Sequence, residues 1–424
     1  MLDRSIAPAF KIQDKFELHK PDSAYLDNGI PIHIIRSGTQ PLLRIELIFK
    51  GGTWHEAGNG HSFFTTKMLS EGTKTHTAKE IEEKIAFFGA FLDLETGADR
   101  CTIVLYCLSK YLTALLPLLS EIVKCPTFPE EELSNLKKIT RQNLEINFNK
   151  TNYLASIHFK ALMFGKTHPY GRYLTQESIE AIDRSVLIDH YSEYFSSDRC
   201  EILVSGNGPE DFYKSINEFL GNSKWGHEKD NLVPAHNMAT SKNLFEPKED
   251  SLQSSIRVGL PLFKMSDPDY FSSYIYIEIL GGYFGSRLMK NIREDKGYTY
   301  GIHANFVTLK NAGYLAIGTD VKKEFTANTI EEIHKEINIL NTELVEVEEL
   351  NSVKNYLLGT FINSINTPFA IADKFKTIHF NSLDYSFYDK YIDSILHINS
   401  SQIQEVGKRY FNVDKLSEVV IGGR

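Results

Sequence analysis

The sequence has no excess of basic residues and no long apolar run. It contains 46 lysines and arginines against 55 acidic residues, which gives a formal net charge of -9. A nucleic-acid-binding protein needs a basic face for phosphates, so we expect no nucleic-acid partner. No stretch approaches the roughly 20 apolar residues of a membrane-spanning helix, and the N-terminal segment MLDRSIAPAFKIQDKF has no apolar core of signal-peptide length. We therefore expect no membrane partner and a cytoplasmic location.

Cysteine is scarce, and the sequence contains no C-x-x-C pair. The four cysteines are widely spaced, at Cys101, Cys107, Cys125 and Cys200. This spacing argues against a disulfide framework and against a thiolate zinc site. We expect buried free thiols in a reducing compartment.

Strand-like and helix-like segments alternate along the 424 residues, and part of their order repeats. The segment FPEEELSNLKK at 128–138 is echoed by VEVEELNSVKN at 345–355, with Glu131 falling on Glu348 at a shift of 348 − 131 = 217. A looser match joins NKTNYLA at 149–155 to INTPFAI at 365–371. Since half of 424 is 212, the shift suggests that one α/β unit was duplicated.

A segment without periodicity separates the two halves. Residues 221–250 are rich in Asn, Lys, Gly and Pro, as linkers often are. We therefore expect an N-terminal domain at 1–225, a linker at 226–250 and a C-terminal domain at 251–424.

Three segments, taken together and in order, resemble one peptidase family. They are GGTWHEAGNGHSFFTTKMLSEGT at 51–73, FGKTHPYGRYLTQESIEAI at 164–182 and ILGGYFGSRLMKNIREDKGYTYGIHANF at 279–306. Their order and spacing are similar to the insulinase/pitrilysin family of zinc metallopeptidases, in the two-domain branch that includes mitochondrial processing peptidase. The resemblance implies an α+β fold with two homologous domains, each a mostly antiparallel sheet backed by helices, enclosing a chamber.

The zinc-binding motif of that family is absent. Active members carry an inverted H-x-x-E-H helix, whose i, i+4 histidines bind zinc while the glutamate acts as base. Alignment on Met68–Thr73 places the five motif positions at Phe63, Phe64, Thr65, Thr66 and Lys67. Phe63 and Lys67 then replace the two histidines and Thr66 replaces the base. Lys67 also puts a cation where a dication would sit.

No other register restores a metal site. With His61 as the first ligand, apolar or hydroxyl side chains still occupy the remaining positions. Glu145 resembles the family's third, carboxylate ligand, but alone we expect it to be a solvated helix residue or a partner for Lys67. His55, Glu56 and His61 form H-E-x4-H, which lacks the i, i+4 face of H-E-x-x-H. We predict no catalytic residue and no metal ligand in this chain, and zinc only in a partner subunit.

Arg293 and Tyr300 lie seven residues apart in IREDKGYTY. The resemblance implies that this pair binds substrate, reaching towards the carbonyl that becomes an oxyanion. A guanidinium and a phenol are suitable donors for that charge. The alternatives are a surface ion pair of Arg293 with Glu294 or Asp295, and a packed strand position for Tyr300.

The strand region GAFLDLETG at 89–97 resembles the family's edge strand, to which an extended peptide adds by β-augmentation. Asp93 is the nearest counterpart of an asparagine that the family usually shows there. An ordinary alternating strand is the alternative.

The resemblance therefore implies a non-catalytic subunit that binds extended peptide and completes the active site of a zinc-bearing homologue, as a heterodimer. Two alternatives stay open. One is a structural or scaffolding subunit without a peptide role. The other is a self-sufficient homodimeric metallopeptidase with unusual ligands.

Overall fold

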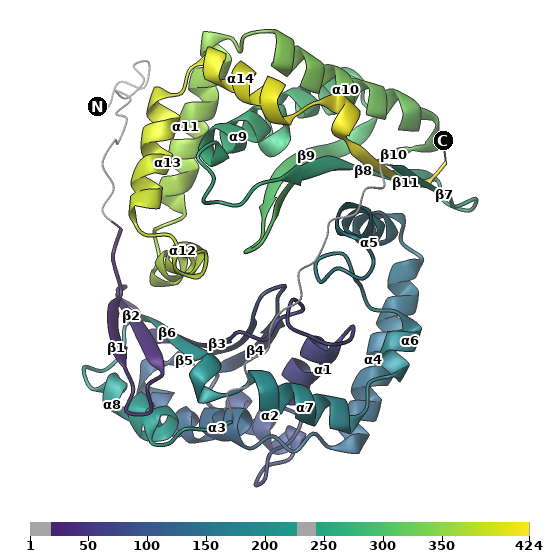
Figure 1. The fold of residues 1–424 in the computed structure, drawn as a ribbon. Helices are drawn as coiled ribbons and strands as arrows, with labels where there is room; N and C mark the ends of the chain where they lie inside the picture. Colours follow the sequence, from purple (N-terminus) through teal and green to yellow (C-terminus); the bar gives the residue numbers. More distant parts are fainter. Residues whose placement is uncertain (1–17, 227–242, 424) are drawn as a thin grey trace, which may run out of the picture.

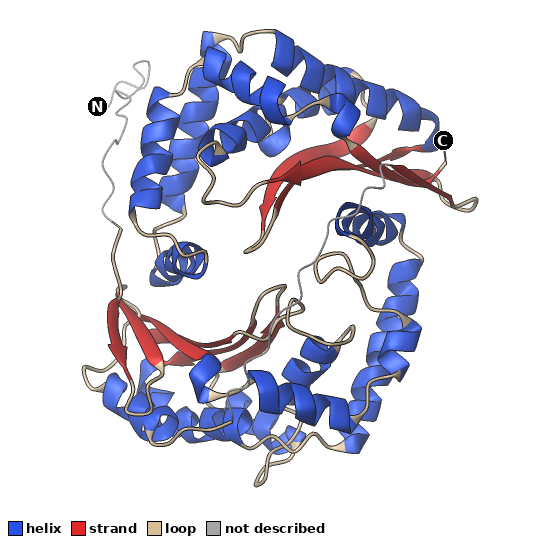
Figure 2. Cartoon of the chain, viewed as in Figure 1, coloured by secondary structure: helices blue, strands red, loops and turns tan. Residues whose placement is uncertain are grey.

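The structure is a computed structural model that describes residues 18–226 and 243–423. The chain forms two halves, and each is a β-sheet with helices packed on its outer side (Figure 2). The inner faces of the two sheets are turned towards each other across the molecule (Figure 1). The predicted α+β class with two sheet-and-helix domains is confirmed.

The N-terminal sheet has the strand order β1-β2-β6-β3-β5-β4 in the described residues. Only β2 and β6 pair in parallel, and the other neighbours are antiparallel. The strands are β1 (Asp22–Tyr25), β2 (Pro31–Arg36), β3 (Leu42–Phe49), β4 (Phe91–Thr96), β5 (Cys101–Leu108) and β6 (Cys200–Gly206).

Helices cover the outer face of this sheet. They are α1 (His61–Met68), α2 (Ala78–Phe87), α3 (Leu112–Lys124), α4 (Glu130–Phe148), α5 (Thr151–Phe164), α6 (Gln176–Glu180), α7 (Arg184–Tyr194) and α8 (Phe212–Ile216). In Figure 1, α2, α3, α7 and α8 lie on the outer side of the sheet, α4 and α6 stand at its flank, and α5 lies on the inner side. The predicted threonine cap of the helix after residue 77 is confirmed, since Thr77 and Glu80 form a capping box.

The C-terminal sheet has the order β7-β11-β8-β10-β9 in the described residues, again with a single parallel pair, β7 and β11. The strands are β7 (Asn243–Pro247), β8 (Gln253–Leu262), β9 (Thr299–Thr308), β10 (Gly313–Lys322) and β11 (Ser417–Gly422). The helices of this half are α9 (Tyr270–Ile277), α10 (Thr326–Thr342), α11 (Val347–Asn363), α12 (Pro368–Phe380), α13 (Ser386–His397) and α14 (Ser400–Tyr410).

The two halves repeat the same order of elements. Helix α5 begins at Thr151 and α12 at Pro368, a shift of 368 − 151 = 217, and β6 and β11 begin at Cys200 and Ser417, again 217 apart. The strand orders of the two sheets also correspond, because β2-β6-β3-β5-β4 matches β7-β11-β8-β10-β9. The duplication suggested by the sequence therefore agrees with the fold.

One helix of each half packs against the sheet of the other half. Helix α5 packs on the inner face of the C-terminal sheet, where Leu154, Phe159 and Met163 join a core with Val419 and Ile421. A side chain at Gly259 on β8 would collide first with the carbonyl oxygen of Leu315 on the neighbouring strand and also with Phe159, so this glycine allows the close approach of both. Helix α12 packs in the same way on the N-terminal sheet (Figure 1).

The predicted linker falls mainly on 227–242, which lies outside the described residues. Its last part contains β7, so the C-terminal sheet begins before residue 251. The exact domain limits stay a prediction. Within 18–226 and 243–423, no helix combines the length and apolar character needed to cross a membrane.

Candidate functional site

Helix α1 contains the positions that correspond to the zinc-binding motif of the family that the sequence resembles. Phe63 and Lys67 are one turn apart and half-buried, whereas Thr66 is fully buried. Thr66 faces the thiol of Cys101, whose pKa is raised to about 12 by burial. A phenyl ring, an ammonium group and a neutral hydroxyl supply neither ligands nor a base. These three side chains therefore do not form the zinc-binding set of an H-x-x-E-H helix, and the absence of a catalytic metal from this chain stays a prediction.

The H-E-x4-H pattern has a structural role. Glu56 is buried, and its carboxylate accepts hydrogen bonds from the backbone N–H groups of Gly60 (3.3 Å) and Ser62 (2.9 Å), at the start of α1. Arg172 lies 3.7 Å from the same carboxylate. Burial raises the pKa of Glu56, against these hydrogen bonds and the charge of Arg172. The carboxylate thus caps the helix, and the ring of His61 packs against His190 instead.

Glu145 is exposed on α4, and its carboxylate accepts a hydrogen bond from Gln176 Nε2 at 3.4 Å. Within the part of the chain that the structure describes, it forms no ion pair with Lys67. Of the two expectations for Glu145, the solvated helix residue agrees with the structure.

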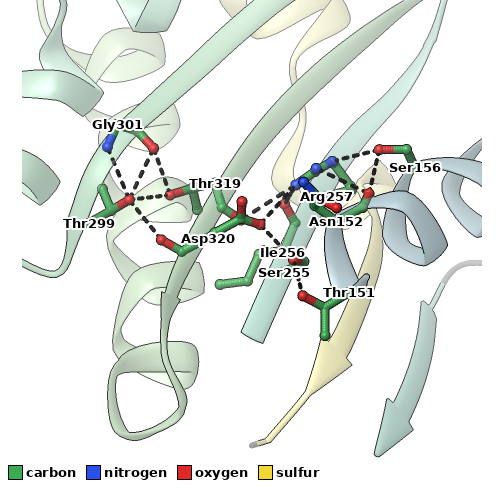
Figure 3. Close-up of polar contacts among 10 residues, drawn as sticks. All are labelled: Thr151, Asn152, Ser156, Ser255, Ile256, Arg257, Thr299, Gly301, Thr319 and Asp320. Carbon is green, nitrogen blue, oxygen red and sulfur yellow. Dashed lines mark hydrogen bonds and ion pairs between the residues drawn. The ribbon is translucent and has the colours of Figure 1, made fainter. Parts of the chain in front are cut away.

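Tyr300 stands on a β-bulge of edge strand β9. The partners of β10 residues Thr319 and Val321 are Ile302 and Thr299, so β9 has one extra residue at Tyr300–Gly301. The hydroxyl of Thr299 holds this bulge: it accepts from Gly301 N at 3.1 Å and lies 2.8 Å from the Asp320 carbonyl oxygen (Figure 3). A bulge redirects a side chain from the regular alternation.

The side chain of Tyr300 is 94% exposed, so the packed position considered for it is wrong. Its phenol can therefore reach a ligand outside the sheet.

An open groove of about 630 Å³ lies on the inner face of the C-terminal sheet. Its lining comes from β8, β9 and β10 and comprises Gln253, Arg257, Thr299, Tyr300, Gly301, His303, Asn305, Ala316, Ile317, Gly318, Thr319 and Asp320. Eight of these twelve residues have a polar side chain. Such a lining suits a polar, extended main chain better than an apolar small molecule.

Arg257 lies at the wall of this groove next to α5. Its guanidinium donates to Ser156 Oγ (3.3 Å) and to the Ile256 carbonyl oxygen (2.9 Å), and it lies 3.8 Å from Asp320 (Figure 3). Burial lowers the pKa of Arg257, with Asp320 opposing the effect. Arg257 was not predicted as a site residue from the sequence, although an arginine within the apolar strand SSIRVGL was a usable signal.

Arg293 lies at the end of the π-helical segment η5 (Met289–Asp295), before β9. Its guanidinium stacks over the ring of Phe284 at 4.6 Å and forms no ion pair with Glu294 or Asp295 in the described residues. Arg293 is half-buried, and Phe284 is exposed. Unlike Tyr300, Arg293 is not part of the groove lining. A role for the pair in binding substrate stays a prediction.

Strand β4 is the edge of the N-terminal sheet, because it pairs only with β5 in the described residues. Its outer edge therefore offers unpaired backbone groups. Leu92 and Leu94 turn towards the helix-covered core, so alternation places Asp93 and Glu95 on the opposite, inner side. Asp93 accepts a hydrogen bond from the backbone of Leu94 at 2.8 Å.

Comparison with known proteins gives the family. The family model described as insulinase (peptidase family M16) matches residues 33–168, and the one described as peptidase M16 inactive domain matches residues 181–357. The chain belongs to the insulinase, or M16, family of peptidases.

The named relatives differ in how their activity is described. The chain is 21% identical over 391 residues to "Uncharacterized zinc protease YmxG" of Bacillus subtilis, covering 91% of this chain and 95% of that protein. It is 22% identical over 408 residues to "Non-peptidase homolog YmxG" of Helicobacter pylori, covering 93% and 92%. It is also 21% identical over 394 residues to mitochondrial-processing peptidase subunit alpha of Pongo abelii, covering 85% and 74%.

A solved structure shares the fold. The crystal structure of a peptidase M16 inactive domain from Pseudomonas fluorescens matches with a TM-score of 0.86 at 22% identity, covering 96% of this chain and 98% of that one.

Proposed function

We propose that this protein is the non-catalytic subunit of an M16 metallopeptidase. It binds an extended peptide and completes the active site of a homologous partner that carries H-x-x-E-H and the zinc. The observation that carries the proposal is the contrast between α1, where Phe63, Thr66 and Lys67 cannot bind metal, and Tyr300, whose phenol is free on a bulged edge strand. The chain thus lacks the zinc ligands and the base needed for hydrolysis but has a polar surface on which a peptide can bind.

The groove and the two edge strands supply complementary contacts. Unpaired backbone groups at the edge of β4 or β9 bind the peptide main chain, as in β-augmentation. Tyr300 then donates its phenolic hydrogen, and Arg293 its charged N–H groups, to the carbonyl oxygen that becomes negative during cleavage in the partner. Donors that act on developing charge raise the rate more than they raise the affinity.

The test is reconstitution with an H-x-x-E-H-bearing homologue from the same genome, using a quenched fluorescent peptide. The wild-type chain should raise the cleavage rate. Tyr300→Phe should lower kcat of the complex by roughly 10²-fold with little change in KM, because it removes one oxyanion donor. Tyr25→Phe is the matched control, because Tyr25 is exposed on β1, at the opposite edge of the N-terminal sheet.

Equal kcat values for the wild-type and Tyr300→Phe complexes would contradict the role of Tyr300. Binding of the partner without any rate increase would instead support a scaffolding subunit. Backbone contacts are tested separately: N-methylation of alternate peptide residues should weaken binding at least roughly tenfold if the peptide adds as a strand.

A further inference from the structure

Two histidines and a glutamate meet where α12 of the C-terminal half packs on the N-terminal sheet. His33 comes from β2, Glu201 from β6 and His379 from α12, and one ligand atom of each lies within 4.8 Å of the other two. His379 Nε2 is 2.6 Å from Glu201 Oε2, and His33 Nε2 is 3.7 Å from the same oxygen. In residues 18–226 and 243–423, this is the only group of three or more such side chains placed to share an ion.

The surroundings fix both imidazole rings. Phe375 packs against the ring of His33 at 4.8 Å and stacks on that of His379 at 4.9 Å. The Nδ1 atom of His33 is hydrogen-bonded with Ser23 Oγ at 2.8 Å. A hydrogen bond at one ring nitrogen orients the other for a metal, as second-shell groups do.

The Nε2 atom of His33 is buried and has no hydrogen-bond partner in the described part of the chain. A buried polar atom without a hydrogen bond is costly and calls for an explanation. This nitrogen faces the carboxylate of Glu201 at 3.7 Å, which is beyond hydrogen-bonding distance.

We propose that His33, Glu201 and His379 form a binding site for a divalent transition metal of the zinc type. Two neutral imidazoles and one carboxylate are a donor set that zinc accepts, with water as a fourth ligand. Metal–ligand distances of about 2.0–2.1 Å place tetrahedral ligand atoms about 3.3 Å apart. The observed separations, from 2.6 to at most 4.8 Å, bracket this value, so small side-chain rotations are sufficient.

Nearby cations limit the affinity of this site. Lys50, Arg100 and Lys310 all act electrostatically on Glu201. Arg100 is held in place, stacked over Phe380 at 3.7 Å. Their charges favour ionised Glu201 but repel a dication. Removing one of them, as in Lys50→Gln, should therefore tighten metal binding.

The site would join the two halves. Its ligands come from two strands of the N-terminal sheet and from α12, which belongs to the C-terminal half. A bound ion would therefore stabilise the contact that sets how the inner faces meet, independently of any peptide-binding role. The metal-site proposal can therefore fail without affecting the proposed function, and the reverse also holds, because testing the metal site needs no peptidase assay.

The test uses the full chain, stripped with a chelator and titrated with Zn²⁺ and with Co²⁺. We expect one ion per chain and visible Co²⁺ absorption of tetrahedral strength. His33→Gln, Glu201→Gln and His379→Gln should each weaken binding at least roughly tenfold. His397→Gln is the matched control, because His397 is an exposed histidine paired with Asp393 on α13. Circular dichroism checks that every variant is folded.

Binding of less than one ion per chain, or unchanged affinity in all three folded variants, would overturn the site. If a variant does not fold, X-ray absorption spectroscopy of the zinc-loaded wild-type protein identifies the metal ligands instead. Two imidazole nitrogens and a carboxylate oxygen are expected, and any other set of protein ligands overturns the proposal.

Discussion

Thr66 occupies the position of the catalytic glutamate in the family motif, and it is fully buried. We predict that Thr66→Glu lowers the free energy of unfolding by about 3 kcal/mol or more, because an unpaired carboxylate would be placed in the core. Thr66→Val should change it by less than about 1 kcal/mol, since the polar contact of the Thr66 hydroxyl is with the thiol of Cys101, which is a weak hydrogen-bonding group, and valine has nearly the same shape. Urea unfolding measures both. A Thr66→Glu protein as stable as wild type would show that α1 still has room for the base.

His190 makes the stability of the N-terminal half depend on pH. Burial, together with the neighbouring His61 and His55, lowers the pKa of His190 to about 3. In the unfolded chain the pKa is about 6.5, so below that pH the unfolded state takes up a proton that the folded state does not. Stability therefore falls as pH drops from 6.5 towards 3, by up to about 1.4 kcal/mol per pH unit from this group.

We predict that His190→Gln reduces this dependence, measured by urea unfolding between pH 7 and pH 5. The exposed His397 provides the comparison, and His397→Gln should keep the wild-type slope. An identical slope in His190→Gln would mean that other groups control the acid sensitivity.

The residues of the candidate sites differ in how far the sequence could predict them. Phe63, Thr66 and Lys67 followed from the position of a local motif. Tyr300 was identified, but its exposure depends on a bulge that no local pattern signals. His33, Glu201 and His379 lie 201 − 33 = 168 and 379 − 201 = 178 residues apart, so only the packing of α12 on the sheet brings them together.

At the scale of elements, β3 and α12 are joined by a network of ion pairs whose members on β3 are buried. Arg44 lies 3.0 Å from Glu46 and 2.9 Å from Asp373, and Lys376 contacts both carboxylates. Arg44 and Glu46 are almost fully buried on the inner face of the sheet. Burying ions is costly unless each is paired, so the loss of one partner exposes the full penalty.

We predict that Glu46→Gln destabilises the protein by about 3 kcal/mol, because two cations would then share one carboxylate. Glu83→Gln, which breaks the exposed Lys79–Glu83 pair on α2, should cost less than about 0.5 kcal/mol. Thermal or urea unfolding distinguishes the two. Equal, small effects would mean that water solvates the contact between β3 and α12.

Helices α5 and α12 show which properties of an element cannot be predicted from the sequence pattern. The loosely matching segments at 149–155 and 365–371, part of the suggested duplication, contain the first residues of α5 and α12. Their exchange between the two sheets was not predictable, because an apolar helix face does not specify which of two similar sheets will bury it.

At the scale of the whole molecule, both sheets turn polar and charged groups inward. Arg44, Glu46 and Glu201 lie on the inner side of one sheet, and Arg257 and Asp320 line the groove of the other. The outer faces form the apolar cores under the helices. Two sheets with polar facing surfaces suit a ligand that offers main-chain hydrogen-bonding groups, as an extended peptide does.

The family, the two-domain class and the missing zinc motif were all predictable from sequence, because they depend on ordered local segments. The identity of a partner was not, since a surface that binds another chain has no required local pattern.

The most direct test of the central claim is a rate titration. The H-x-x-E-H-bearing homologue is held at fixed concentration, and peptide cleavage is measured while this chain is added. We predict that the rate rises and saturates at one chain per partner, and that this chain alone does not cleave the peptide. A rate that stays flat across the titration, or cleavage by the isolated chain, would contradict the account.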